Sequence, residues 1–335
     1  MRESALARTV LRRSKIAALP AMPLVWSRTP GAGYERAVVS THLFARHVRF
    51  PASDDLTRYV YVHTPARYLW TPELDPRGRS LPVRAVAPML RSVDRRAAQR
   101  GRAVYAANSR FVADRVRDCW DVDARVIHPP VDAAAVAAVA DWGRALSPED
   151  ARLLEGLPEH FVLGASRMVE YKRLDKVVDA GVAVGLPVVL AGGGPDEDRL
   201  RGYGDAAPVP VHLLGRVSDA LLYALYQRCS VYAFLGVEDF GIMPVEAMAA
   251  GAAVVANRTG GAAESVLDGR TGALCDPDDP EDLAAAVARA LAAAPQACRA
   301  QALTFDRQVF ESRIAAWVDE RLPDAPSAEQ QLDPA

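Results

Sequence analysis

The segment GVEDFGIMPVEAMAAGAAVVA, residues 236–256, decides the fold of this chain. The apolar run before it predicts a strand, Pro244 predicts the first residue of a helix, and Gly251 ends that helix before a second apolar run. We therefore expect strand, helix and strand in succession, which is the repeating unit of a parallel sheet covered by helices. In this arrangement Glu238 follows the first strand and Glu246 lies in the first turn of the helix.

The same segment indicates what this edge of the sheet binds. The backbone N–H groups of Gly241, Ile242 and Met243 should point out of an open helix N-terminus, which attracts anions. A carboxylate such as Glu238 or Glu246 accepts hydrogen bonds from a vicinal diol. Two such acids flanking an anion site fit a nucleotide sugar, which has a sugar, phosphates and a ribose in that order. For this segment taken alone, a surface acid and a glutamate placed for the helix dipole are the alternative.

Basic and glycine-rich loops follow three other expected strands, in FVLGASRMVEYKRLD, PVVLAGGGPDEDRL and VPVHLLGRVSD. These loops contain Arg167, Lys172, Gly193, Arg216 and Val217. Ligands of open parallel sheets bind just outside the carboxyl ends of the strands. Cations, small residues and diol-binding acids are therefore expected together at one edge of one sheet.

Together these motifs resemble the retaining GT-B glycosyltransferases of family 4, in particular the bacterial mannosyltransferases that act in polysaccharide assembly. The resemblance covers almost the whole chain, and it includes YVHTPARYLW (61–70), AANSRFVADRV (106–116), PPVD (129–132) and GGAAESVLDGRTG (260–272). It implies an α/β protein with two Rossmann-like domains, whose parallel sheets face each other across a cleft. The donor site would lie in the C-terminal domain.

The resemblance also implies roles for individual residues. Arg167 and Lys172 would hold the diphosphate, Glu238 the transferred sugar and Glu246 the ribose. The backbone near Arg216 would meet the base. The expected catalytic residues are His63, Arg167, Lys172 and Glu238. The expected substrate-binding residues are Gly193, Arg216, Val217, Phe240, Gly241, Ile242, Met243 and Glu246. His63 would approach the sugar from the N-terminal domain, whereas His42 stays open between a structural and a functional role.

The expected chemistry needs no metal or other cofactor. Breaking a glycosidic bond to a nucleotide develops negative charge on the diphosphate, and fixed cations with helix N–H groups stabilise such charge. The acids at Asp276, Asp278 and Asp279 precede Pro280 and are better explained by helix capping than by metal binding. No carboxylate pair for double displacement is evident. The resemblance instead implies front-face attack, with the leaving phosphate taking the proton of the acceptor.

The net charge of −2 hides a strong asymmetry. Residues 1–145 carry 24 Lys and Arg against 13 Asp and Glu, whereas residues 146–335 carry 16 against 29. A basic half indicates an anionic partner. Attraction between the two domains, adhesion to anionic lipid and nucleic-acid binding are the alternatives, and no nucleic-acid motif supports the last. The basic, amphipathic residues 1–20 fit either peripheral contact with the inner face of a membrane or an ordinary solvated helix.

Four expected parts follow from these patterns. They are an acceptor-side domain at 1–150, a donor domain at 157–305, a helix at 306–322 and a disordered tail at 323–335. The charge changes sign near residues 147–160, where we place the connection between the domains. The resemblance implies that the helix crosses back to the first domain. It also implies that an opening βαβ unit is missing, through a misassigned start, a partner chain that supplies it, or degradation of the gene.

The expected function is a retaining hexosyltransferase that acts on a nucleotide sugar and a glycan or lipid-linked acceptor. The expectation that the donor is GDP-mannose rests only on the resemblance to the mannosyltransferase branch. Scattered cysteines without CxxC spacing indicate a reduced, cytoplasmic chain, and no apolar run reaches the ~20 residues of a membrane span. A non-catalytic or partner-dependent homologue and an epimerase or phosphorylase of the same fold remain alternatives.

Overall fold

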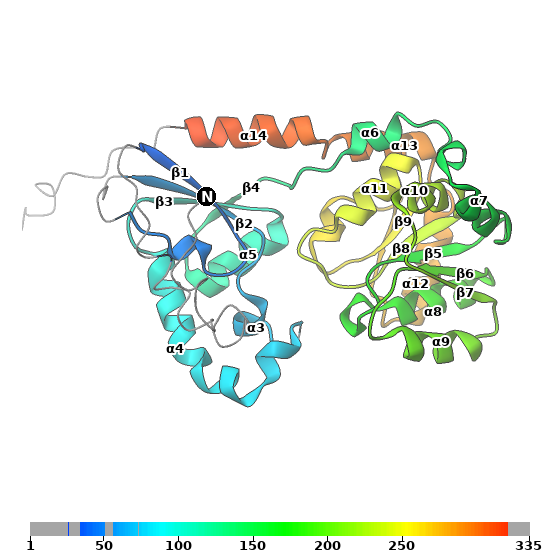
Figure 1. The fold of residues 1–335 in the computed structure, drawn as a ribbon, viewed down its shortest axis with the longest axis horizontal. Coiled ribbons are helices and arrows are strands. Elements are labelled where there is room, and N and C mark those ends of the chain that lie inside the picture. Colours follow the sequence, from blue (N-terminus) through cyan, green and yellow to red (C-terminus); the bar gives the residue numbers. More distant parts are fainter. Residues whose placement is uncertain (1–25, 27–33, 51–55, 73, 321–335) are drawn as a thin grey trace, which may run out of the picture.

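The computed structural model describes residues 26, 34–50, 56–72 and 74–320, which form two α/β lobes (Figure 1). The first lobe has one parallel sheet in the order β1-β2-β3-β4. Its strands are β1 (Arg36–Thr41), β2 (Thr57–Val62), β3 (Ala103–Ala107) and β4 (Ala124–Val126). Its helices are α3 (Arg67–Trp70), α4 (Leu81–Ala98) and α5 (Arg110–Trp120), with 3-10 turns η4 (Ala45–His47) and η5 (Pro76–Arg79).

The second lobe has a six-stranded parallel sheet in the order β10-β9-β8-β5-β6-β7. Its strands are β5 (Val162–Ala165), β6 (Val188–Ala191), β7 (Val211–Gly215), β8 (Val231–Phe234), β9 (Val254–Asn257) and β10 (Gly272–Cys275). The chain proceeds outward from β5 to β7, returns to place β8 on the other side of β5, and proceeds outward again. The strand order therefore reverses between β5 and β8, and a crevice at such a reversal is where this fold class binds ligands.

Helices cover both faces of the second sheet, which explains its strand sequences. These helices are α8 (Leu174–Val184), α9 (Glu197–Asp205), α10 (Asp219–Arg228), α11 (Ile242–Ala250), α12 (Pro280–Ala290) and α13 (Pro295–Leu303). Because side chains alternate along a strand, Val162 packs into the core on one face and Leu163 into the core on the other. Strands buried on both faces have continuous apolar sequences, as β5 and β8 do.

The chain crosses from the first lobe to the second at residues 128–131, earlier than the expected connection at 147–160. Val131, Ala133 and Val136 already belong to the core of the second lobe. The elements α6 (Ala133–Ala137), η6 (Trp142–Ala145) and α7 (Pro148–Glu155) lie beside that lobe in Figure 1. The sign of the charge reports surface composition, whereas these apolar contacts assign residues 131–150 to the second lobe rather than to the first domain.

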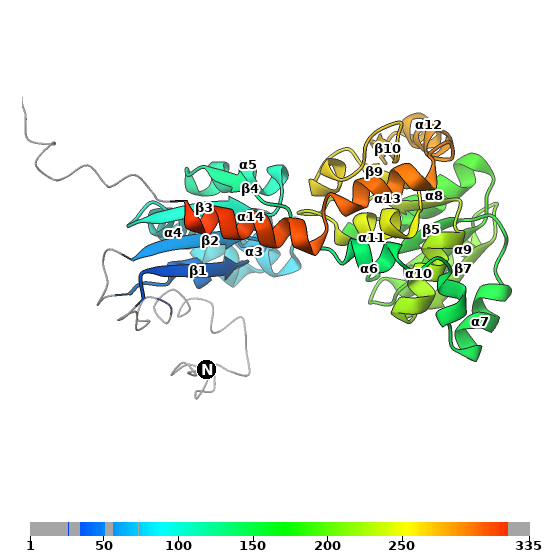
Figure 2. The same cartoon turned by 90° about the horizontal axis from the view of Figure 1, so that it is seen from above.

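The last described helix, α14 (Arg307–Asp319), lies along the sheet of the first lobe (Figure 2). Trp317 is 1% exposed, and its ring meets the ring of Tyr59 edge-on at 5.3 Å between centroids. Arg36 donates to the carbonyl of Val318 and pairs with Asp319. The two lobes are therefore joined by two segments of the chain. The amphipathic residues 1–20 and the expected tail at 323–335 lie outside the described residues.

Within the described ranges, none of the helices combines the length and apolar character that crossing a bilayer requires. All four cysteine thiols are free.

Candidate functional site

A cavity of about 390 Å³ lies at the carboxyl ends of β5, β6 and β7. Five residues singled out in the sequence line it, namely Arg167, Gly193, Arg216, Val217 and Met243. They come from the loops after β5, β6 and β7 and from the first turn of α11, and the parallel strands bring these segments to one edge of the sheet. Arg167 Nη2 also donates to the hydroxyl of Tyr171 at 3.2 Å.

The three-glycine turn allows two loops of this cavity to touch. Gly192 has φ 134°, and a Cβ there would lie 1.8 Å from the carbonyl oxygen of Ser166. A Cβ on Gly194 would lie 2.2 Å from the carbonyl oxygen of Met168. Only glycine lets the loop after β6 approach the backbone of the loop after β5 this closely.

Helix α11 begins at Ile242, two residues before Pro244, which corrects the expected start. Gly241 is its N-cap, with φ 87°, and this residue has no side chain with which to cap the amides of the first turn. Pro244 is tolerated because the third residue of a helix has no intrahelical partner for an N–H group. As a consequence, Glu246 lies in the second turn of α11 and not in the first.

Phe240 does not face the cavity, contrary to its expected role in substrate binding. Its side chain is 3% exposed, and its ring packs against those of His128 and Phe305, with centroids 5.4 Å and 5.6 Å away. The loop after β8 therefore places Phe240 in the core of the second lobe. Ile242, 44% exposed, and Gly241 do not line the cavity either.

Glu246 is half-buried and makes no hydrogen bond or ion pair with any described residue. Burial raises the pKa of its carboxyl above the ordinary value, and Asp219 and Asp132 add repulsion in the same direction. This carboxylate retains its capacity to accept hydrogen bonds from a hydroxyl-bearing ligand.

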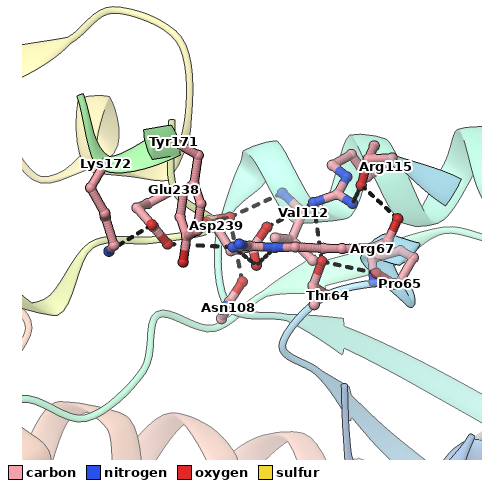
Figure 3. Close-up of polar contacts among 12 residues, drawn as sticks. Thr64, Pro65, Arg67, Asn108, Val112, Arg115, Tyr171, Lys172, Glu238 and Asp239 are labelled. Atoms are coloured by element: carbon pink, nitrogen blue, oxygen red, sulfur yellow. Dashed lines mark hydrogen bonds and ion pairs between the residues drawn. The ribbon is translucent and has the colours of Figure 1, made fainter. Parts of the chain in front are cut away.

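Glu238 lies between cations of both lobes (Figure 3). Lys172 Nζ is 2.7 Å from its Oε1, and Arg67 Nη2 from the first lobe is 3.3 Å from its Oε2. Its side chain is 14% exposed. The structure thus joins two of the expected catalytic residues, Lys172 and Glu238, and adds Arg67, which the sequence analysis did not single out.

Asp239 is a second residue that sequence reasoning missed. Its carboxylate pairs with Arg67 and with Arg115, both from the first lobe. All three residues lie inside motifs quoted from the sequence, but a single acid and single arginines in such motifs look like surface charges. The adjacency of Asp239 to Glu238 was the one signal that could have pointed to it.

His63 follows the last residue of β2, and its Nε2 lies 2.8 Å from the hydroxyl of Ser40. Burial lowers its pKa, His42 adds repulsion in the same direction, and Asp239 opposes both. The ring is therefore neutral near pH 7 and stands edge-on to Tyr61 at 5.2 Å. The described contacts of His63 do not include Lys172 or Glu238.

Glu264 makes another contact between the lobes. Its carboxylate accepts hydrogen bonds from the amides of Arg110 and Phe111, at 2.9 Å and 3.0 Å, at the N-terminus of α5. His128 Nε2 lies 3.0 Å from the same carboxylate. Burial opposes its ionisation, but His128 and the two amides outweigh burial and lower the pKa of Glu264.

Residues 149–302 match the family model described as glycosyl transferases group 1. This match lies within the second lobe and covers less than half of the chain. Sucrose-phosphate synthase from Thermosynechococcus elongatus has the same fold, with a TM-score of 0.66, 19% identity, and 91% of this chain and 78% of that chain covered. Anabaena HepE in complex with UDP-glucose has a TM-score of 0.60, 23% identity, and 80% and 74% coverage. The expected GT-B fold and the resemblance to glycosyltransferases are confirmed.

Two curated relatives of this chain come from Mycolicibacterium smegmatis. A phosphatidyl-myo-inositol mannosyltransferase is 35% identical over 148 residues, which are 41% of this chain and 38% of the relative. A GDP-mannose-dependent alpha-(1-6)-phosphatidylinositol monomannoside mannosyltransferase is 33% identical over 146 residues, which are 39% and 38% of the two chains. The chain thus spans well under half the length of these curated relatives.

Proposed function

We propose that this chain is a retaining hexosyltransferase that uses a nucleotide-sugar donor, with GDP-mannose as the first candidate. The observation that carries the proposal is the joining of Lys172 to Glu238 beside the cavity lined by Arg167, Gly193 and Arg216. The similarity of this chain to two mannosyltransferases, one described as GDP-mannose-dependent, supports mannose. The UDP-glucose complex of HepE supports a nucleotide-sugar donor and makes UDP the alternative to GDP as the donor nucleotide.

The nucleotide would occupy the cavity at the ends of β5 to β7. The base would meet the backbone near Arg216 and Val217, and the unpartnered carboxylate of Glu246 would accept the ribose hydroxyls. The diphosphate would lie between Arg167, Lys172 and the first-turn amides of α11, because cations and helix N–H groups favour negative charge there. The transferred sugar would then lie against Glu238.

In the proposed reaction, an acceptor hydroxyl forms a bond to the sugar carbon as the bond from that carbon to the diphosphate breaks, and the diphosphate takes the hydroxyl proton. Negative charge develops on the diphosphate as it leaves. Arg167, Lys172 and the amides of α11 would stabilise that charge, since pre-positioned donors lower the barrier most when charge develops at them. Glu238 would orient the sugar hydroxyls, and neutral His63 would donate or accept a hydrogen bond at the sugar. No metal is required by this scheme.

A lipid-linked or glycan acceptor is part of the proposal, and the first lobe has a surface that fits anionic lipid. Helix α4 exposes Leu81, Met89 and Val93, at 78%, 59% and 38%, beside the exposed Arg84 and Arg96. Its one acid, Asp94, is 1% exposed, so the surface of the helix is basic and apolar. Such a surface lies in the headgroup region of anionic bilayers.

The test is titration calorimetry with GDP and UDP, followed by transfer assays with GDP-mannose and UDP-glucose. The proposal is supported if the chain binds one of the two nucleotides and also releases that nucleotide from its sugar when acceptor extract is present. Binding without transfer would support the non-catalytic alternative, and absence of nucleotide binding would overturn the proposal. Co-sedimentation with phosphatidylglycerol vesicles, lost in Leu81→Glu/Met89→Glu, tests the surface of α4.

A further inference from the structure

Two arginines of the first lobe converge on Asp239 of the second (Figure 3). Arg67 Nε and Nη2 lie 3.1 Å and 2.6 Å from Asp239 Oδ2. Arg115 Nη1 lies 2.7 Å from Asp239 Oδ1. The side chains of Arg67, Arg115 and Asp239 are 17%, 11% and 13% exposed, so water screens these contacts far less than it screens surface ion pairs.

The first lobe holds this contact from three directions. Arg115 donates to the hydroxyls of Thr64 and Thr71, at 3.0 Å and 2.8 Å, which orients its guanidinium towards Asp239. Arg67 is the first residue of α3. Ser109, the N-cap of α5, donates its hydroxyl to the backbone carbonyl of Asp239. Both carboxylate oxygens of Asp239 are bound by oriented donors of the first lobe. These contacts therefore favour one position of the second lobe relative to the first.

Arg67 connects this contact to the proposed sugar site. Its Nη2 reaches Asp239 and also lies 3.3 Å from Glu238 Oε2, and its guanidinium carbon lies 5.9 Å from the centre of the Tyr171 ring. Glu238 and Asp239 are consecutive residues of one loop. Any change in the distance between the lobes that pulls on Asp239 therefore also moves the carboxylate of Glu238.

We propose that Asp239 is the clamp by which Arg67 and Arg115 hold the first lobe against the donor site, and that Arg67 is a positioning residue for Glu238. The second part rests on the proposed function, whereas the clamp does not. The charges agree with this arrangement. Three cations, Lys172, Arg67 and Arg115, meet two carboxylates. If a diphosphate draws Lys172 away, two arginines and two carboxylates remain balanced at the contact between the lobes.

The central experiment uses Asp239→Asn in the full chain, because this change keeps the shape of the side chain and removes its charge. Asp123→Asn is the matched control, since Asp123 pairs with Arg117 on the surface of the first lobe alone. Small-angle scattering should show a larger radius of gyration for Asp239→Asn and no change for the control. Unchanged scattering for Asp239→Asn would overturn the clamp, and this result does not depend on any activity.

The positioning role has its own readout. For Arg67→Met we expect kcat to fall about 10²-fold with little change in donor KM, because a small misplacement of a reacting group affects the transition state most. Arg67→Lys should recover part of kcat, since one of the two carboxylate contacts can re-form. If Arg67→Met and Arg67→Lys lose kcat equally and keep their nucleotide affinity, Arg67 has only a steric role. This result would overturn its role in positioning Glu238. Thermal unfolding of each variant identifies misfolding. If an Arg67 variant misfolds, the kcat of Asp239→Asn tests the positioning of Glu238 instead.

The design separates two kinds of failure. If the wild-type chain binds neither GDP nor UDP, the proposed function fails, and the scattering comparison still tests the clamp. If nucleotide binds and Asp239→Asn behaves like Asp123→Asn in scattering and kcat, the clamp fails and the proposed function stands.

Discussion

Lys172 Nζ lies 2.7 Å from Glu238 Oε1, which ties the loop after β5 to the loop after β8 across the point where the strand order reverses. Under the proposed function, these two residues serve opposite ends of one bond, the diphosphate and the transferred sugar. A diphosphate would compete with Glu238 for the ammonium group. Donor binding would then release the carboxylate of Glu238 for the sugar hydroxyls.

Lys172→Ala and Arg167→Ala should each lower kcat/KM by about 10²–10³, the effect of removing one fixed stabiliser of developing charge. Steady-state transfer kinetics with the preferred donor measure this. Lys176→Ala is the control, because Lys176 pairs with Asp179 within α8, whereas Lys172 pairs with Glu238. Near-normal turnover by either variant would remove that residue from the mechanism.

Glu246→Ala should weaken the binding of free nucleoside diphosphate about tenfold or more, since hydrogen bonds to a charged group contribute about 1.5–3 kcal/mol. Glu238→Ala should leave that binding nearly unchanged while abolishing transfer, because its proposed ligand is the sugar. Calorimetry on both variants tests the assignment. Equal losses of nucleotide affinity would contradict it.

The affinity for the nucleotide sugar should fall as the pH drops through a range above the ordinary glutamate pKa of 4.5. The pKa of Glu246 is raised, and its ionised form accepts hydrogen bonds from the ribose hydroxyls more strongly than its protonated form does. Glu246→Gln should bind more weakly at neutral pH and lose this part of the pH response. The Kd of GDP-mannose or UDP-glucose across the range measures it. A parallel pH profile in wild type and Glu246→Gln would assign the response to another group.

The same raised pKa predicts a stability effect of opposite sign. Folding favours the protonated form of Glu246, so its ionisation destabilises the fold at pH values above its raised pKa and ceases to do so as the pH falls through that value. Glu246→Gln should therefore raise the Tm at neutral pH, and the gain should disappear under acidic conditions. A lower Tm for Glu246→Gln at neutral pH would show that the carboxylate is stabilising instead.

Glu264→Gln should lower stability by about 1–2 kcal/mol near neutral pH, since it removes a charge from the N-terminus of α5 and from His128. The pKa of Glu264 is lowered by folding, so its contribution is present above the ordinary carboxyl pKa and is lost as the pH falls through the lowered value. Denaturant unfolding at several pH values measures this. Glu159→Gln, at an exposed position, is the control. A loss of stability that does not depend on pH would show that altered packing, and not the lost charge, destabilises Glu264→Gln.

Gly192→Ala should destabilise the second lobe and weaken nucleotide binding, because its Cβ would lie 1.8 Å from the carbonyl oxygen of Ser166 at positive φ. Gly202→Ala is the matched control. A Cβ there meets no atom within 4 Å, and alanine in a helix interior is favoured over glycine by about 1 kcal/mol. Thermal unfolding with and without nucleotide compares the two. Equal Tm values would show that the loop after β6 can move to accommodate the methyl group.

Much of the candidate site could be predicted before the fold was seen. Arg167, Gly193 and Arg216 each follow an expected strand, Met243 directly precedes an expected helix, and parallel strands place all their carboxyl ends at one edge. The start of α11 was misplaced by two residues because Pro244 is allowed at more than one position of a first helical turn. The direction of Phe240 was also missed, since a loop has no fixed alternation of buried and exposed side chains.

The sequence by itself determined the local structure, namely alternating strands and helices, glycine where two backbones approach, and charged residues just after strands. These features depend on residues within about one helical turn or one strand pair of each other. Only the tertiary structure decided which lobe residues 131–150 join and which arginines meet Asp239. Arg67 and Arg115 lie 172 and 124 residues from Asp239 along the chain. No local pattern records such a pairing, because it depends on how the apolar surfaces of two lobes and α14 fit together.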